Sequence, residues 1–207
     1  HPTVSLGIRG PVCGFECHGD GNILTNNFVR NYLQGAYVCA TSSGVSRGDI
    51  ITGNVFQVGW RGLSTWSLDP VDQGLTDAII SDNVVALLSV ELITSRVSFP
   101  KVGFAITSDS ENIGPIVLDG NVFSSSDTQG SVAVAIYATG ATNGRIKSVH
   151  VRGGSIRGFS RGVSLNHNGS ARNIDFVSII GVPMTEFAAT ALYSTTAGIV
   201  VVSGTTI

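Results

Sequence analysis

Acidic side chains that could carry out acid–base chemistry gather in one stretch of the chain, between residues 54 and 121. Four of them form two close pairs along the sequence: Asp69 with Asp72, and Asp109 with Glu111. Two carboxyl groups held roughly 5 to 9.5 Å apart can break a glycosidic bond, one as the acid and the other as base or nucleophile. These four residues are therefore the candidate catalytic groups.

The same stretch contains both tryptophans of the chain together with several basic residues. Flat apolar rings stack on the faces of sugars, and guanidinium or ammonium groups bind polar groups at the rim of such sites. The candidate substrate-binding residues are Trp60, Arg61, Trp66, Arg96 and Lys101. In the structural alternative, Trp66 is an ordinary strand residue and Asp69-Pro70 an ordinary turn.

The sequence predicts no metal ion and no other cofactor. The three cysteines form no C-x-x-C pair, and the histidines lack the spacing of helical metal ligands. Clustered aspartates of the D-x-D or D-D type, which would hold calcium, are also missing. A net charge of −2 with scattered signs disfavours nucleic acid as a partner. No apolar run approaches the roughly 18 residues of a membrane-spanning helix, so membrane insertion is not expected.

A seven-residue pattern recurs along the chain and predicts how these side chains are positioned. Each copy has two aliphatic residues, two small or polar residues, an asparagine and two apolar residues; the copies are 23–29, 50–56, 79–85 and 117–123. Their asparagines, Asn27, Asn54, Asn83 and Asn121, follow one another at intervals of 27, 29 and 38 residues. Weaker copies lie at 6–12, 151–156, 180–182 and 201–207, which indicates about seven turns.

Between these copies lies a second pattern, a glycine or alanine followed by alternating apolar residues. It begins at Gly14, Gly35, Gly62, Gly103, Ala135, Gly162 and Ala191. Short β-branched runs bounded by Gly, Asn, Asp and Ser indicate strands, and residues 186–192 are the one short stretch with a helical period. Two or three strands per turn predict an all-β parallel solenoid.

Such a solenoid stacks its turns at the strand spacing of about 4.8 Å, so the four asparagines should form a column at one corner. Asparagine suits a corner because it tolerates a left-handed backbone and its amide can bond within and between turns. In this register Asp82 and Asp119 occupy neighbouring slots, offset by one position, and form a further candidate acid pair.

The pattern aliphatic-x-x-Gly-Asn-x-Phe, present at 50–56 and 117–123, together with the glycine-led strands, resembles the right-handed parallel β-helix proteins of the pectate-lyase-like superfamily. The resemblance covers residues 4–207 and is greatest to the β-helix of a bacteriophage tailspike. It implies a single-stranded right-handed parallel β-helix of about seven turns, in one domain over residues 1–207. Because the chain begins at His1 without a methionine, we expect it to be part of a longer chain.

The resemblance also implies a function: binding of a bacterial surface polysaccharide, with or without hydrolysis by a glycoside hydrolase, on a virion tail or outside the cell. The composition, with 43% hydrophobic and only 13% charged residues, leaves apolar surface for a subunit interface. The resemblance implies that the assembly is a homotrimer. Two alternatives stay open. One is a polysaccharide lyase or epimerase of the same superfamily, and the other is a non-catalytic structural or adhesive solenoid.

Overall fold

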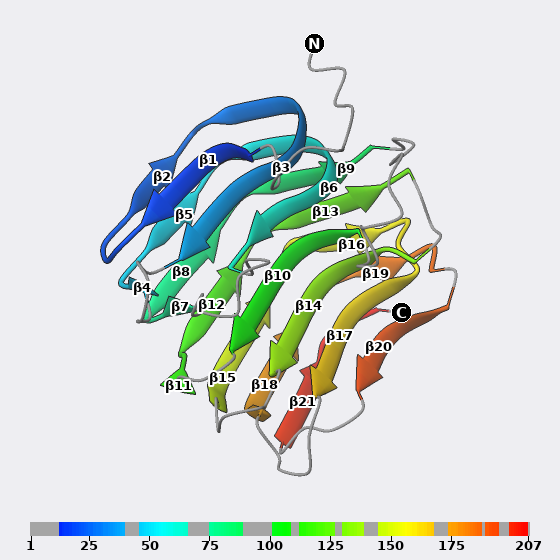
Figure 1. The fold of residues 1–207 in the computed structure, drawn as a ribbon. Coiled ribbons are helices and arrows are strands. Elements are labelled where there is room, and N and C mark those ends of the chain that lie inside the picture. Colours follow the sequence, from blue (N-terminus) through cyan, green and yellow to red (C-terminus); the bar gives the residue numbers. More distant parts are fainter. Residues whose placement is uncertain are drawn as a thin grey trace.

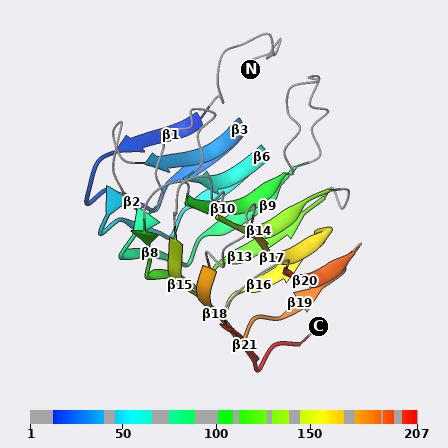
Figure 2. The same ribbon diagram turned by 60° about the horizontal axis from the view of Figure 1, so that its bottom comes forward.

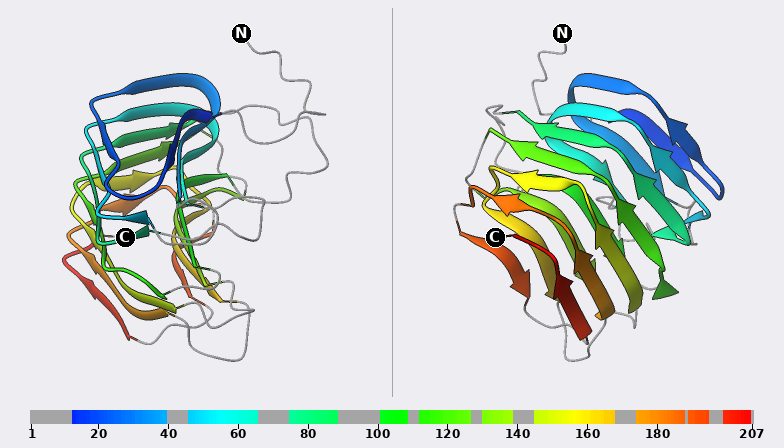
Figure 3. Two further views of the ribbon diagram at one scale, coloured as in Figure 1. Left: turned by 60° about the vertical axis from the view of Figure 1, so that its left-hand side comes forward. Right: turned by 180° about the vertical axis from the view of Figure 1, so that it is seen from behind.

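Strands are the only regular elements in the described part of the computed structural model, and every strand pair in it is parallel. The described residues are 13–39, 46–65, 75–88, 101–108, 112–126, 130–138, 145–167, 174–187, 189–194 and 199–206. Successive strands stack as rungs, from β1 and β3 at one end to β20 and β21 at the other (Figures 1 and 3). The predicted all-β class and parallel stacking are confirmed.

The strands form three long stacks, which we call sheets 1, 2 and 3. Sheet 1 contains β2 (Ile23–Thr25), β5 (Ile50–Thr52), β8 (Ala78–Ser81), β12 (Ile116–Asp119), β15 (Arg145–Arg152), β18 (Ile174–Ile180) and β21 (Ile199–Ser203), with β11 (Asn112–Ile113) beside β15. Sheet 2 contains the first halves of β3 (Phe28–Cys39) and β6 (Val55–Ser64), then β9 (Val84–Leu87), β13 (Val122–Ser125), β16 (Ser155–Arg157) and β19 (Met184–Thr185).

Sheet 3 contains β1 (Cys13–His18), the second halves of β3 and β6, β10 (Val102–Ser108), β14 (Val132–Ala138), β17 (Arg161–His167) and β20 (Thr190–Ser194). Sheets 2 and 3 are continuous through β3 and β6, and the pairing of these two strands shifts register on both sides of Tyr32. The shift marks the bend between the two sheets (Figure 2). A separate pair is formed by β4 (Ser46–Arg47) and β7 (Leu75–Thr76).

The core consists of columns of inward-facing side chains, one from each turn. In sheet 1 the register stacks Leu24, Ile51, Ile80, Leu118, Val151 and Ile179, all of them buried. Aromatic rings fill the space between sheets 2 and 3, where Phe104 and Phe123 meet edge to face with ring centroids 4.8 Å apart. Each buried aliphatic or aromatic side chain contributes roughly 1.5–3 kcal/mol, so these columns hold the turns together.

The predicted asparagine column is confirmed at the corner between sheets 1 and 2. The backbone N–H and the side-chain amide of each asparagine donate to Oδ1 of the next: Asn27 to Asn54 at 3.0 and 2.9 Å, Asn54 to Asn83 at 3.0 and 2.9 Å, and Asn83 to Asn121 at 3.1 and 3.0 Å. Three of the amides also donate to backbone carbonyls of the preceding turn. This ladder gives buried polar groups the partners that they need.

The ladder ends at Gly154 for a steric reason. A Cβ atom at this position would lie 1.9 Å from the carbonyl oxygen of Asn121, so no side chain fits. The left-handed backbone of the corner also differs from the expectation, because it belongs to the residue before each ladder asparagine. Asn26, Gly53, Asp82 and Gly120 have φ between 54° and 66°. Hydrogen bonding is therefore the property that suits asparagine to the ladder.

The glycine-led column lies where the chain bends into sheet 3. A Cβ on Gly35 would lie 2.5 Å from both the Gly62 carbonyl oxygen and Cδ1 of Phe56, which explains the glycine. One predicted member was wrong by two positions: the register places Ala133 opposite Gly103, whereas Ala135 pairs with Ala105. The possible helix at 186–192 was also wrong, because β20 begins at Thr190 and neither 186–187 nor 189 is helical.

No helix in the described part of the chain has the length and the apolar character to cross a membrane.

Candidate functional site

The connections between strands are short on one side of the solenoid and longer and more variable on another. Sheets 1 and 2 are joined by the same tight corner at residues 26–27, 53–54, 82–83 and 120–121. By contrast, the chain runs from Ser64 to Leu75 between β6 and β7, and from Leu87 to Val102 between β9 and β10. Both long connections adjoin sheet 3. Because insertions in solenoids emerge on one face and often form its binding surface, the outer face of sheet 3 is the candidate site.

Six of the nine predicted site residues lie outside the described residues. In chain order, Trp66, Asp69 and Asp72 belong to the connection between β6 and β7, and Arg96 belongs to the one between β9 and β10. Asp109 and Glu111 lie between β10 and β11. The catalytic role of the four carboxylates therefore stays a prediction. All six residues belong to connections that begin or end at a strand of sheet 3.

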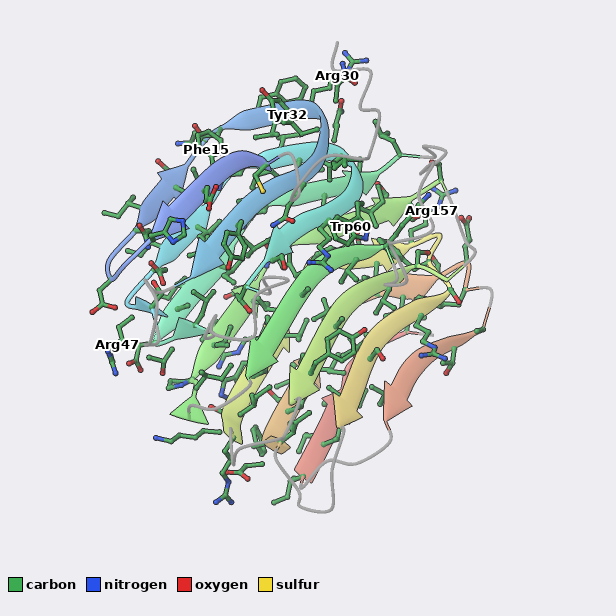
Figure 4. All side chains as sticks on the ribbon, in the orientation of Figure 1. Phe15, Arg30, Tyr32, Arg47, Trp60 and Arg157 are labelled. Atoms are coloured by element: carbon green, nitrogen blue, oxygen red, sulfur yellow. The ribbon has the colours of Figure 1, made fainter. Side chains whose placement is uncertain are left out.

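Trp60 and Arg61 are adjacent on β6, near the start of β10 (Figure 4). The guanidinium carbon of Arg61 lies 3.8 Å from the centroid of the Trp60 ring, a cation–π contact worth about 2 kcal/mol when desolvated. The exposed fractions are only 5% for Trp60 and 2% for Arg61, so neither forms an open platform. Their predicted part in binding is not tested.

The charge on Arg61 is held in a desolvated position. Burial lowers the pKa of Arg61 from its ordinary value to about 9, and the nearby Tyr137 and Cys13 partly oppose this decrease. Since that pKa is still above 7, the guanidinium is positive at neutral pH. Its Nη1 donates to Oγ of Ser64 at 3.2 Å. A desolvated cation interacts more strongly with polar groups than one in water.

Gln34 lies directly opposite Arg61 on the neighbouring rung. Its side chain is fully buried, and its Nε2 donates to the carbonyl oxygen of Ala36 at 3.1 Å. Its Oε1, and likewise Nε1 of Trp60, are buried without a hydrogen-bond partner among the residues that the structure describes. A buried polar atom without a partner costs roughly 1–3 kcal/mol. One acceptor and one donor therefore remain available beside Arg61 for a polar ligand or a water molecule.

An apolar strip continues this cluster along the outer face of sheet 3. Val102, Ala105, Val132 and Ala135 form a buried cluster on β10 and β14, and Tyr137 packs against it. Burial raises the pKa of Tyr137, although the nearby Arg161 and Arg61 partly oppose the rise. The phenol is therefore protonated at neutral pH and can donate a hydrogen bond.

Lys101, the third described residue of the predicted set, is half-buried at the residue before β10. Sequence reasoning missed Gln34, Tyr137 and Arg161. Gln34 sits 27 residues before Arg61, so the turn period alone could have found it. Arg161 shares its register position with Arg61, with Val102 and Val132 between them, and a correct alignment of the glycine column would have revealed this.

The predicted pair Asp82 and Asp119 lies elsewhere, at the corner between sheets 1 and 2. Asp119 pairs with Ser81, so the offset of one position is confirmed. Both aspartates are exposed. On sheet 3, Glu16 Oε1 and His18 Nε2 are 2.9 Å apart at the exposed first rung. No group of three or more His, Cys, Asp or Glu side chains in the described ranges is placed to hold a metal ion.

Comparisons with known proteins add a weak structural likeness. No family model matches the sequence, and no curated protein matches it. Among solved structures, the catalytic unit of a thermostable GH87 alpha-1,3-glucanase from Streptomyces thermodiastaticus strain HF3-3 is similar over 91% of this chain, with 11% sequence identity and a TM-score of 0.30. The match covers 49% of that chain, so this chain spans about half its length. Function therefore has to be inferred from this chain's own residues.

Proposed function

We propose that this protein is a parallel β-helix that binds a bacterial surface polysaccharide along the outer face of sheet 3. The observation that carries the proposal is the cluster of Gln34, Trp60 and Arg61, in which a buried acceptor and a buried donor lack partners in the described residues, beside a desolvated cation. Sugars present hydroxyl groups that both donate and accept hydrogen bonds, so they match this mixed set better than an anion or a hydrocarbon does.

The shape of the site suits an extended ligand. Arg61 and Arg161 share one register position three rungs apart, which corresponds to about 14 Å at the strand spacing. The apolar strip with Tyr137 lies beside this line. The aliphatic side chains of the strip are buried and support the partly exposed Tyr137. A sugar ring would pack on the Tyr137 ring, while hydroxyl groups of the sugar chain reach the polar side chains at each end.

The finer features of the proposal follow from the superfamily resemblance. They are a right-handed β-helix of about seven turns, a tailspike or appendage of a bacteriophage, a location on the virion tail or outside the cell, and a homotrimeric state. In a hydrolytic form, Asp69, Asp72, Asp109 and Glu111 supply the acid and the base or nucleophile, because connections flanking the glycan face carry them.

Binding is tested on a glycan array of bacterial capsule and O-antigen polysaccharides, followed by titration with the best ligand. Gln34→Leu and Tyr137→Phe remove one hydrogen-bonding group each and should weaken binding about tenfold, equivalent to roughly 1.4 kcal/mol. Tyr32→Phe is the matched control, since Tyr32 is exposed and precedes the bend into sheet 3. If no glycan binds, the non-catalytic solenoid becomes the better description.

Catalysis is tested separately by the release of reducing ends from the bound polysaccharide. A hydrolase should lose this activity when the essential carboxylate is replaced, for example in Asp69→Asn or Asp109→Asn, while glycan binding persists. Products with a new ultraviolet absorbance would assign the protein to the lyases instead, because elimination leaves an unsaturated sugar and hydrolysis does not.

A further inference from the structure

Exposed apolar side chains concentrate on the outer faces of sheets 1 and 2. Among the described residues, every exposed large hydrophobic side chain except Tyr32 lies on a strand of these two sheets. In the first four turns these are Ile23 (70% exposed), Ile50 (38%) and Ile79 (48%) on sheet 1, and Phe28 (63%), Val84 (38%) and Val122 (38%) on sheet 2. The outer face of sheet 3 differs, since its apolar side chains in β10 and β14 are buried.

These side chains form two straight columns, one on each side of the asparagine corner. The register aligns Ile23, Ile50, Ile79 and Val117 on sheet 1, and Phe28, Val55, Val84 and Val122 on sheet 2. We call them the corner columns. Each extends over four rungs, about 14 Å at the strand spacing. Patches of this kind on a soluble protein mark interaction sites.

The corner columns consist of Ile, Val and Phe alone, although exposed charges lie near them at Arg30 on β3 and Asp119 on β12. The strands β2, β5, β8, β9 and β13 contain no acidic or basic residue. Beyond the end of the ladder the same register positions become polar: His150 follows Val117, and Ser155 follows Val122. The side chains of Arg157 and Glu186 then pair across the outer face of sheet 2 at 2.7 Å. The polar interruption is followed in the last turn by exposed apolar side chains of sheet 1, among them Ile199 and Val201. The ladder turns are the part of the described chain in which both columns are apolar on every rung.

We propose that the corner columns are the contact between copies of this chain, with the sheet 1 column of one copy packed against the sheet 2 column of the next. Side chains that repeat every rung can interlock along their whole length only with a surface of the same repeat, and a second copy lying parallel has it. The inference deepens the proposed function, because it names the surface that would build its homotrimer.

Area and symmetry support a ring instead of a twofold dimer. Three or four half-exposed side chains per column offer on the order of a few hundred Å², less than the roughly 800 Å² per partner of a standard interface. A twofold dimer that packs like columns together leaves the other column in water, and one that packs unlike columns has to bring both columns of each copy into contact around a single corner. A head-to-tail contact uses both columns of every copy, and three copies make the smallest ring that such a contact closes.

The first test is the mass of the 207-residue protein by light scattering and sedimentation equilibrium at micromolar concentration. The expected mass is about three times the 21.5 kDa of one chain. Ile79→Lys and Val84→Lys place a charge in the middle of one column each, and each variant should weaken association at least tenfold. Ser203→Lys and Thr185→Lys are matched controls, because they add the same charge at exposed positions of the same two sheets in the last turn, and they should stay trimeric.

A mixing experiment distinguishes the head-to-tail contact from other assemblies. Ile79→Lys retains an intact sheet 2 column and Val84→Lys an intact sheet 1 column, so an equimolar mixture should form a two-chain species that neither variant forms alone. Circular dichroism checks the fold, and Ile79→Thr with Val84→Thr serve as strand-compatible replacements if the lysine variants unfold. A monomeric wild-type protein, or a trimer that both column variants leave intact, would overturn the proposal. Glycan binding is measured on the same samples. A failure of the proposed glycan binding can therefore be told apart from a failure of the proposed contact between copies.

Discussion

Two regions of this solenoid contain buried side-chain amides, but among the described residues only one of the two regions gives all of these amides hydrogen-bond partners. At the corner between sheets 1 and 2, stacked amides donate to the next rung and accept from the one before, so buried polar groups have partners. On the outer face of sheet 3, the amide of Gln34 leaves an acceptor without a partner in the described chain. The corner keeps one length in each turn, whereas the connections around sheet 3 vary. The comparison separates residues that maintain the rod from residues available to a ligand.

The largest expected effect is that of a side chain at the end of the ladder. Gly154→Ala places a Cβ 1.9 Å from the Asn121 carbonyl oxygen, so the backbone has to move and we expect a loss of about 4 kcal/mol or more in the free energy of unfolding. Gly130→Ala is the control: it has a similar φ of 66° and nothing within 4 Å, and should cost only about 1 kcal/mol. Urea denaturation of both variants measures the difference.

Next in size is the loss of an amide inside the ladder. Asn83→Ala removes the acceptor for two donors of Asn54 and leaves the carbonyl of Ile51 without its amide donor, which should cost about 3 kcal/mol. Asn27→Ala removes only donations from the first ladder residue and should cost about 1 kcal/mol. Equal losses in thermal or urea unfolding would show that the ladder does not act as a connected network.

The same type of side chain should behave differently on sheet 3. Gln34→Leu removes a buried acceptor without a described partner and one hydrogen bond to the Ala36 carbonyl oxygen. The loss of an unpaired buried acceptor stabilises the fold, whereas the loss of the hydrogen bond destabilises it. The free energy of unfolding should therefore change by less than about 1 kcal/mol, while the affinity for the glycan falls. A loss of stability as large as that of Asn83→Ala would contradict the division of the molecule into two regions.

The smallest effect is a change in stability at alkaline pH. Burial raises the pKa of Tyr137 above its ordinary value of 10, so between these two pKa values the folded state holds a proton that the unfolded state has released. The contribution of Tyr137 is complete below pH 10 and is lost as the pH rises through the folded-state pKa. Tyr137→Phe should therefore lose less stability than wild type between pH 8 and pH 11, whereas the exposed-site variant Tyr32→Phe should resemble wild type.

The sequence predicted the repeating framework well because each turn has to meet the same local requirements. The position of Asn54 and Asn83 in the repeat requires hydrogen bonds to identical neighbours, so the same residue type recurs there and can be recognised in the sequence. The glycine column was less certain: both Ala133 and Ala135 fit its pattern, and only the strand register separates them. The sequence also did not predict that the residue before each ladder asparagine adopts the left-handed backbone conformation.

The candidate site was harder to predict because burial there depends on how β3 and β6 bend. Trp60 and Arg61 have the composition of an exposed sugar platform, but the register shift near Tyr32 places them together with Gln34 as buried neighbours. No local pattern in the sequence encodes that shift. The partners Gln34 and Arg161 come from other turns, where only the period and the register relate them to Arg61.

The interval between Asn83 and Asn121 is 38 residues, against 27 between Asn27 and Asn54, yet the amide contacts across both intervals have nearly the same lengths. The geometry of the corner therefore does not depend on the length of the connection between β9 and β10. A foreign peptide grafted into that interval would leave the ladder unchanged, which makes this rod a natural scaffold for displaying loops of chosen length.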